Sequence, residues 1–99
     1  MKNQDVIIFD GNDEVSVSVE EIRALTDKSQ LIEIFQSTAI YRDLFKDYLS
    51  QGQADQFEYK KVDRAFRLLS EQLYTVFGED LGLHIIANTS LTINLEKNL

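Results

Sequence analysis

One apolar stripe in the second half of the chain constrains the fold more than any other feature. The stripe consists of Val62, Phe66, Leu69, Leu73 and Phe77. Its spacings of three and four residues are the period of an α-helix that buries one side. Asp55, followed three residues later by Glu58, is typical of a helix start, and Gly78 is typical of a helix end. The pattern therefore predicts a helix over residues 56–77.

The residues before Asp55 predict two more helices. The first is short and begins near Ser29. The second begins at a cap provided by Ser37 or Thr38, ends at residues 50–52, and carries an apolar face at helical spacing. That face consists of Leu44, Phe45, Tyr48 and Leu49.

The N-terminal end of the chain shows the two-residue alternation of a half-buried β-strand. Valines alternate with serines over residues 15–19, and residues 5–9 are the expected partner strand of a hairpin. Ser18 and Glu21 then form an S-x-x-E capping box, which predicts a brief helix directly after the hairpin.

The C-terminal end predicts a second hairpin. Leu91, Ile93 and Leu95 alternate with polar residues, residues 83–87 favour β-structure, and residues 88–90 are typical of a turn. The expected fold class is therefore α+β in a single domain of 99 residues: an N-terminal β-hairpin, three to four helices and a C-terminal β-hairpin. We expect one antiparallel sheet with the helices packed on one face.

The composition is that of a globular domain and excludes several kinds of site and binding partner. Apolar residues make up 43% of the chain and charged residues 27%. The absence of cysteine excludes disulfides, thiolate metal sites and cysteine nucleophiles. No secretory signal pattern or membrane-spanning apolar run is visible, so we expect a cytoplasmic protein. The net charge of −7 argues against binding to nucleic acid or an anionic membrane.

Residues 10–21 resemble the calcium-binding loop of EF-hand proteins. The resemblance supplies an alternative set of metal ligands: Asp10, Asn12, Glu14, Ser18 and Glu21. However, the EF-hand loop needs glycine at its sixth position, where φ is positive, and the β-branched Val15 stands there. A hairpin that turns near Gly11 needs no such exception. We therefore expect a hairpin and no metal, and a ligand- or divalent-metal-responsive module is the alternative function.

No group of residues predicts catalysis. His84 is the only histidine, and we expect it at an ordinary strand position. The adjacent acids at residues 20–21 and 79–80 stand near helix starts or turns, where carboxylates are usually solvated. The four glycines form no phosphate-binding pattern. We therefore expect no enzyme, no catalytic residues and no cofactor.

Aromatic and basic residues of two helices are the candidates for binding a partner protein. They are Tyr41, Phe45, Tyr48, Lys60, Arg64 and Arg67. The chain has six Phe and four Tyr, and we expect part of this surplus to contact a partner or a second copy of the chain as a homo-oligomer. The acidic total favours a basic partner. The sequence thus predicts a small acidic protein-interaction domain, such as an inhibitor, immunity-type protein, adaptor or assembly factor.

Overall fold

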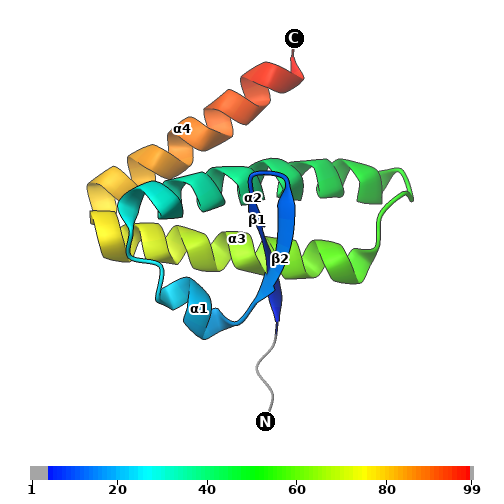
Figure 1. Cartoon of the computed structure of the whole chain (residues 1–99). Coiled ribbons are helices and arrows are strands. Elements are labelled where there is room, and N and C mark those ends of the chain that lie inside the picture. The colour runs from blue at the N-terminus through cyan, green and yellow to red at the C-terminus, as the bar shows by residue number, and fades with distance from the viewer. Residues whose placement is uncertain (1–4, 99) are drawn as a thin grey trace.

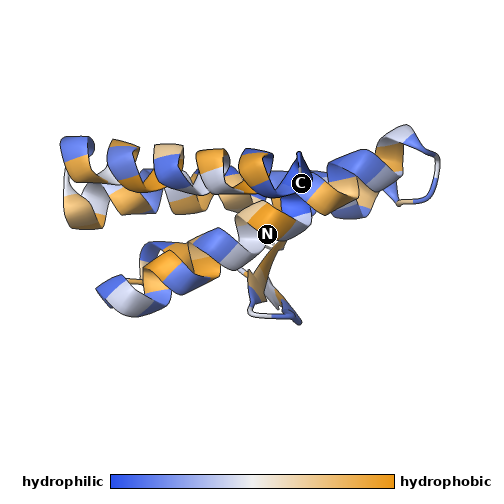
Figure 2. Cartoon of the chain, turned by 90° about the horizontal axis from the view of Figure 1, so that it is seen from above, coloured by the Kyte–Doolittle hydropathy of each residue, from blue (hydrophilic) through white to orange (hydrophobic). Residues whose placement is uncertain are grey.

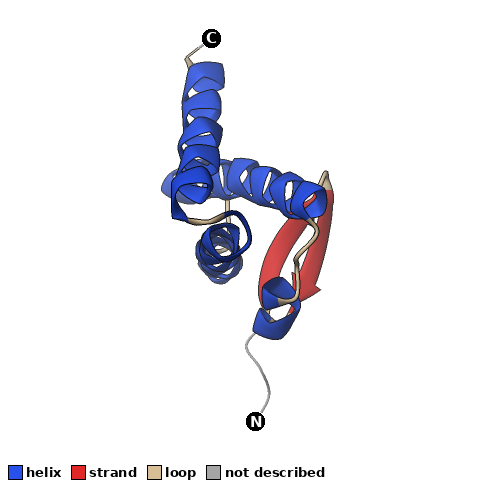
Figure 3. Cartoon of the chain, turned by 90° about the vertical axis from the view of Figure 1, so that its left-hand side faces the viewer, coloured by secondary structure: helices blue, strands red, loops and turns tan. Residues whose placement is uncertain are grey.

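The computed structural model describes residues 5–98, which form a two-stranded hairpin followed by four helices (Figure 1). The elements are β1 (Val6–Asp10), β2 (Asp13–Val17), α1 (Val19–Arg23), α2 (Lys28–Ser50), α3 (Gln56–Phe77) and α4 (Glu79–Lys97). Helices α2 and α3 run antiparallel and pack against each other, and the hairpin crosses them on one side. Helix α4 leaves the end of α3 and rises at an angle to both (Figures 1 and 3).

The N-terminal hairpin is confirmed, and residues 10–21 do not form an EF-hand loop. Val6 lies opposite Val17, and Asp10 lies opposite Asp13, so the turn contains two residues. Gly11 has a φ of 64°, and no residue other than glycine has a positive φ in the described part of the chain. A positive φ at the first turn position alone is the pattern of a type II′ hairpin turn. The predicted strand ends earlier than expected, because α1 begins after Ser18.

Strand β1 is buried on both faces, so the predicted sheet with helices on only one face is wrong. Val6 and Ile8 belong to the main core between α1, α2 and α3. Ile7 and Phe9, on the opposite face, pack in a second cluster around Val62 of α3. One edge of β1 pairs with β2, and the other edge faces α2. The strand therefore lies with one edge against α2, and its two faces are covered by different parts of α2 and α3.

Helix α2 is one continuous helix of 23 residues, where the sequence predicted two. The expected cap residues, Ser37 and Thr38, lie in its interior and bind the hairpin. The N–H of Phe9 donates to Oγ1 of Thr38 at 2.9 Å, and the N–H of Gly11 donates to Oγ of Ser37 at 3.1 Å. The true cap is Asp27, whose side chain accepts from the N–H of Gln30 at the helix start. The hydroxyls of Ser37 and Thr38 thus accept the N–H groups of Gly11 and Phe9, which point away from β2.

Helix α4 replaces the predicted C-terminal hairpin, which is wrong. The α4 residues that are buried or half-buried recur at helical spacing: Gly82, Ile85, Ile86, Thr89 and Ile93. Leu91 and Leu95, which suggested a strand, are exposed. The hydroxyl of Thr89 donates to the carbonyl of Ile85 at 2.9 Å, so this buried polar side chain is satisfied within the helix. The alternation of leucines was therefore not a pattern of burial.

Gly82 allows α4 to cross close to α3. A Cβ atom at this position would lie 3.0 Å from the ring of Tyr74 and 3.2 Å from its backbone N and Cα atoms. Such contacts are too short for an unstrained side chain. The glycine is therefore needed where the two helices meet.

Helices α1 and α3 begin as predicted. Ser18 and Glu21 form a complete capping box at α1, and the side chain of Asp55 accepts from the N–H of Phe57 at α3. At the end of α1, the buried Gln72 of α3 donates from Nε2 to the carbonyls of Arg23 and Leu25, at 3.2 and 2.9 Å. Backbone groups left unpaired where a short helix ends are costly when buried. Gln72 thus fixes α1 against the core.

Candidate protein-binding surfaces

The predicted aromatic residues of α2 divide between internal packing and exposure. Tyr41 stacks on Phe9 with ring centroids 4.0 Å apart, and Phe45 meets the same ring edge-on at 5.9 Å. The hydroxyl of Tyr41 also donates to Oδ1 of Asn12 at 2.9 Å. Tyr48 lies beyond this cluster and is 43% exposed. Two of the three residues thus hold the hairpin on α2, and Tyr48 is the most exposed of them.

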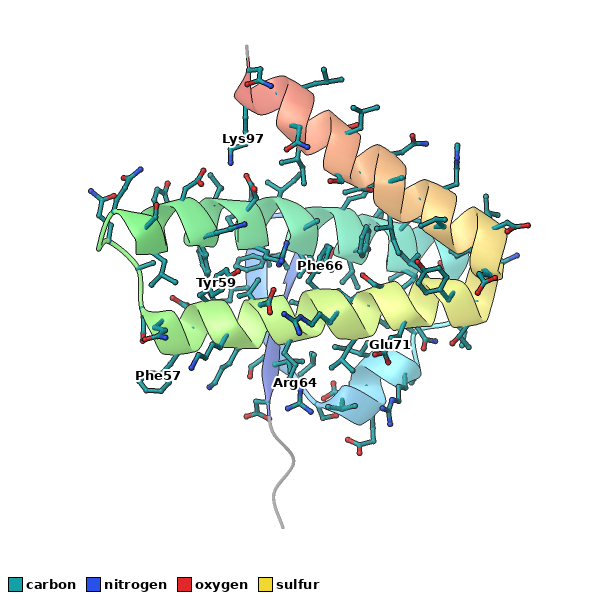
Figure 4. All side chains as sticks on the ribbon, turned by 180° about the vertical axis from the view of Figure 1, so that it is seen from behind. Phe57, Tyr59, Arg64, Phe66, Glu71 and Lys97 are labelled. Atoms are coloured by element: carbon teal, nitrogen blue, oxygen red, sulfur yellow. The ribbon has the colours of Figure 1, made fainter. Side chains whose placement is uncertain are left out.

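Two of the predicted basic residues of α3, Lys60 and Arg64, lie near an exposed aromatic residue that was not among the predicted partner-binding residues. Phe57 is 74% exposed and points away from α2 (Figure 4). Lys60, Lys61 and Arg64 follow it by three, four and seven residues, which places them on the same side of the helix. These four side chains, with Asp5, line a shallow depression. We call Phe57, Lys60, Lys61 and Arg64 the Phe57 surface.

Arg67 belongs to a different arrangement, which links α2 to α3. Nε of Arg67 lies 3.1 Å from Oδ2 of Asp63, and Nε of Arg42 lies 2.7 Å from Oδ1 of the same carboxylate. The guanidinium of Arg42 also lies over the ring of Phe66, 4.5 Å from its centroid. Figure 4 shows Phe66 pointing from α3 toward α2. Asp63 therefore orients two cations, and the Arg67 head group remains at the surface.

Exposed carboxylates gather on the hairpin and in and around α1. They belong to Asp10, Asp13, Glu14, Glu20, Glu21 and Asp27. Beside them a groove of about 200 Å³ lies where the hairpin, α1 and the first turns of α2 meet. Its apolar lining consists of Ile8, Val15, Val17, Ile22, Leu25 and Ile34. We call this the hairpin groove, and Asp10 and Glu21 lie at its exposed margin.

The alternative metal ligands do not come together in the folded chain. Ser18 and Glu21 bind each other's backbone in the capping box, and Asn12 accepts the hydroxyl of Tyr41. Within residues 5–98, no group of three or more histidine or carboxylate side chains is placed to hold a metal ion. The hairpin that replaces the EF-hand loop is the reason, because it points successive side chains to opposite faces.

Glu14 of β2 instead meets Glu58 of α3. The two carboxyl groups lie within interaction distance, so each disfavours the ionised form of its neighbour. Burial raises the pKa of Glu58 above its usual value, and Glu14 and Asp55 raise it further. Neither Glu14 nor Glu58 is a partner in a salt bridge of the described chain. Two acids thus lie close together near the turn of the hairpin, one on β2 and one on α3.

Helix α4 carries a third kind of surface. Its exposed leucines are Leu81, Leu83, Leu91 and Leu95, and Figure 2, seen from above α4, shows apolar and polar positions mixed along the helix. His84, expected on a strand, is exposed on this helix, and its Nε2 lies 3.1 Å from Nδ2 of Asn88.

No helix within residues 5–98 has the length and apolar character to cross a membrane. Comparison with protein-family models, with curated proteins and with solved structures found no match.

Proposed function

We propose that the protein is a small protein-interaction domain that binds another protein through the Phe57 surface. The observation that carries this proposal is the exposure of Phe57, at 74%, at one end of a row of three cations on the same helix face. Scattered apolar residues are normal on protein surfaces, but an exposed phenylalanine followed by three cations on the same helix face is a specific arrangement. Burying such a side chain in a partner contributes about 1.5–3 kcal/mol.

The chemistry of the Phe57 surface favours an acidic partner segment with an apolar pocket. Phe57 would fill the pocket, and Lys60, Lys61 and Arg64 would face carboxylates around it. The acidic remainder of the chain repels such a segment only weakly, because charges further than about 8 Å are largely screened at physiological salt. The sequence-based expectation of a basic partner rests on the net charge of the chain. A basic partner would suit the exposed carboxylates on the hairpin and around α1, and not the Phe57 surface.

Site-specific photo-crosslinking tests the surface directly. A photoreactive phenylalanine derivative at position 57 should give one discrete protein adduct in cells that make the chain. The same derivative in place of Ala87, an exposed residue of α4, is the matched control and should not give that adduct. Adducts of equal pattern from both positions, or none from position 57, would contradict the proposal.

Affinity measurements with the crosslinked partner complete the test. Phe57→Ala should weaken binding by about thirtyfold, the effect of an interface hot spot of about 2 kcal/mol. Lys61→Glu should weaken binding most at low salt, because it reverses a charge facing the partner. Both residues are exposed, so the unfolding temperature should change little. Unchanged affinity in Phe57→Ala would show that the partner contacts another surface.

A further inference from the structure

The outer edge of β2 offers backbone groups that the hairpin does not use. In a hairpin with a two-residue turn, the pair next to the turn exchanges hydrogen bonds, and so does every second pair after it. The register makes these the pairs of Asp13, Val15 and Val17 with β1. The N–H and carbonyl groups of Glu14 and Ser16 therefore point away from β1. Neither residue takes part in the turn, loop and cap backbone bonds of residues 5–98.

This edge is open to solvent, unlike the equivalent edge of β1. Residues 13–16 are all exposed, whereas the β1 edge is bound by the hydroxyls of Ser37 and Thr38. Figures 1 and 3 show the hairpin on the outside of the helical layer. A row of open backbone groups on an exposed edge is the template for adding another strand.

The two faces beside this edge differ in chemistry. Val15 faces the hairpin groove and is 39% exposed, although its neighbour Val17 is buried. On the opposite face, Glu14 lies beside Glu58 of α3, and burial and the repulsion of Glu14 and Asp55 raise the pKa of Glu58. A strand laid along β2 would place one side chain next to Val15 and the adjacent ones near the two acids. An apolar residue fits the first position, and a lysine or arginine fits the second.

We propose that the outer edge of β2 binds an extended segment of a partner protein in which apolar and basic residues alternate, and that this segment becomes the third strand of the sheet. Its apolar side chains cover Val15 and enter the hairpin groove. Its cations neutralise Glu14 and Glu58, and the surrounding carboxylates increase the association rate. This site is separate from the Phe57 surface and takes a partner of the opposite charge.

A synthetic peptide provides the probe. A seven-residue peptide of alternating lysine and valine, labelled for fluorescence anisotropy, should bind the full chain. The decisive control is the same peptide with methylated backbone nitrogens at alternate residues, on the edge that would face β2. It keeps charge and composition but cannot donate hydrogen bonds, so its affinity should fall about tenfold or more. Equal binding of both peptides would show simple charge attraction and overturn the proposal.

Variants of the chain test the same site from the protein side. Val15→Ser should weaken peptide binding, and Ser16→Pro should weaken it by removing an outward N–H from an edge position where proline is tolerated. If Ser16→Pro fails to fold, amide exchange on the parent chain serves instead, and the peptide should protect the N–H groups of Glu14 and Ser16. Protection elsewhere would overturn the proposal. Phe57→Ala should leave peptide binding unchanged, which separates this site from the proposed function.

Discussion

Replacing Thr38 by valine tests how much the buried hydroxyl that accepts from the edge of β1 contributes to stability. Thr38 is fully buried, and its Oγ1 accepts the N–H of Phe9 at 2.9 Å. Valine has nearly the same shape but cannot accept, so the substitution leaves a buried N–H without a partner. An unpaired buried N–H costs about 1–3 kcal/mol, and we expect Thr38→Val to lower the free energy of unfolding by that amount.

Urea unfolding measures this loss, and two matched variants identify its cause. Thr38→Ser keeps the hydroxyl and removes one methyl group, for a loss of about 1 kcal/mol. Ser37→Ala removes the acceptor for Gly11, but that N–H is exposed and can bind water, so the loss should be below about 0.5 kcal/mol. Amide exchange of Phe9 should accelerate in Thr38→Val alone. If Thr38→Val is as stable as the parent and Thr38→Ser is not, only packing matters there, and the reasoning fails.

Four further substitutions or conditions give direct tests. Gly82→Ala should destabilise the chain by about 1–3 kcal/mol, because the added Cβ would press on the backbone of Tyr74. This cost should exceed the gain of about 1 kcal/mol that alanine gives over glycine within a helix. A higher melting temperature would show that α3 and α4 can move apart to accept the Cβ. The raised pKa of Glu58 means that the folded chain holds its proton better than the unfolded chain does, so stability should fall as pH rises through the folded pKa. Glu58→Gln should flatten this fall in urea unfolding across pH, and an unchanged slope would assign it to other groups. Lys97→Ala removes an ammonium that lies 3.1 Å from the carboxylates of Asp43 and Asp47 on α2. Amide exchange in the last turns of α4 should therefore become faster. Equal exchange would show that this end of α4 is held by packing alone. Millimolar calcium should leave the melting temperature unchanged, and a rise abolished by Glu21→Gln would restore the EF-hand interpretation.

The elements that could be predicted from the sequence are those whose signals are local. Asp55 and Gly78 bound α3 correctly because capping needs only neighbouring residues. The hairpin followed from a steric fact about Val15, which cannot take the positive φ that a calcium loop requires. Ser18 and Glu21 formed their capping box for the same local reason.

The elements that could not be predicted depend on distant contacts. The interior position of Ser37 and Thr38 in α2 makes sense only once β1 lies beside them. The contact side of α4 includes Gly82 and Thr89, small residues that a search for large apolar side chains passes over. Tertiary packing decided both cases against local preference.

The residues of the candidate surfaces also divide into those with a local sequence signal and those whose position depends on distant contacts. Phe57 had a detectable signal, since it lies five residues before Val62 and so falls off the apolar stripe of α3. Tyr41 and Phe45 were correctly placed on one helix face, but their contact with Phe9 requires the position of the hairpin. The meeting of Glu14 with Glu58 likewise joins two distant segments.

The burial of β1 on both faces has a consequence for how the chain is made. Val6 and Ile8 are translated about 60 residues before their core neighbour Leu69, an interval of about 3–12 s at ordinary elongation rates. During that interval, four consecutive apolar residues with high β-propensity lack the part of their cover that α3 provides, and such a run promotes association with other chains. Asp5 and Asp10 flank this run, and flanking charges are what limit such association. Slower translation of α3 should therefore lower the yield of folded protein more than slower translation of α4.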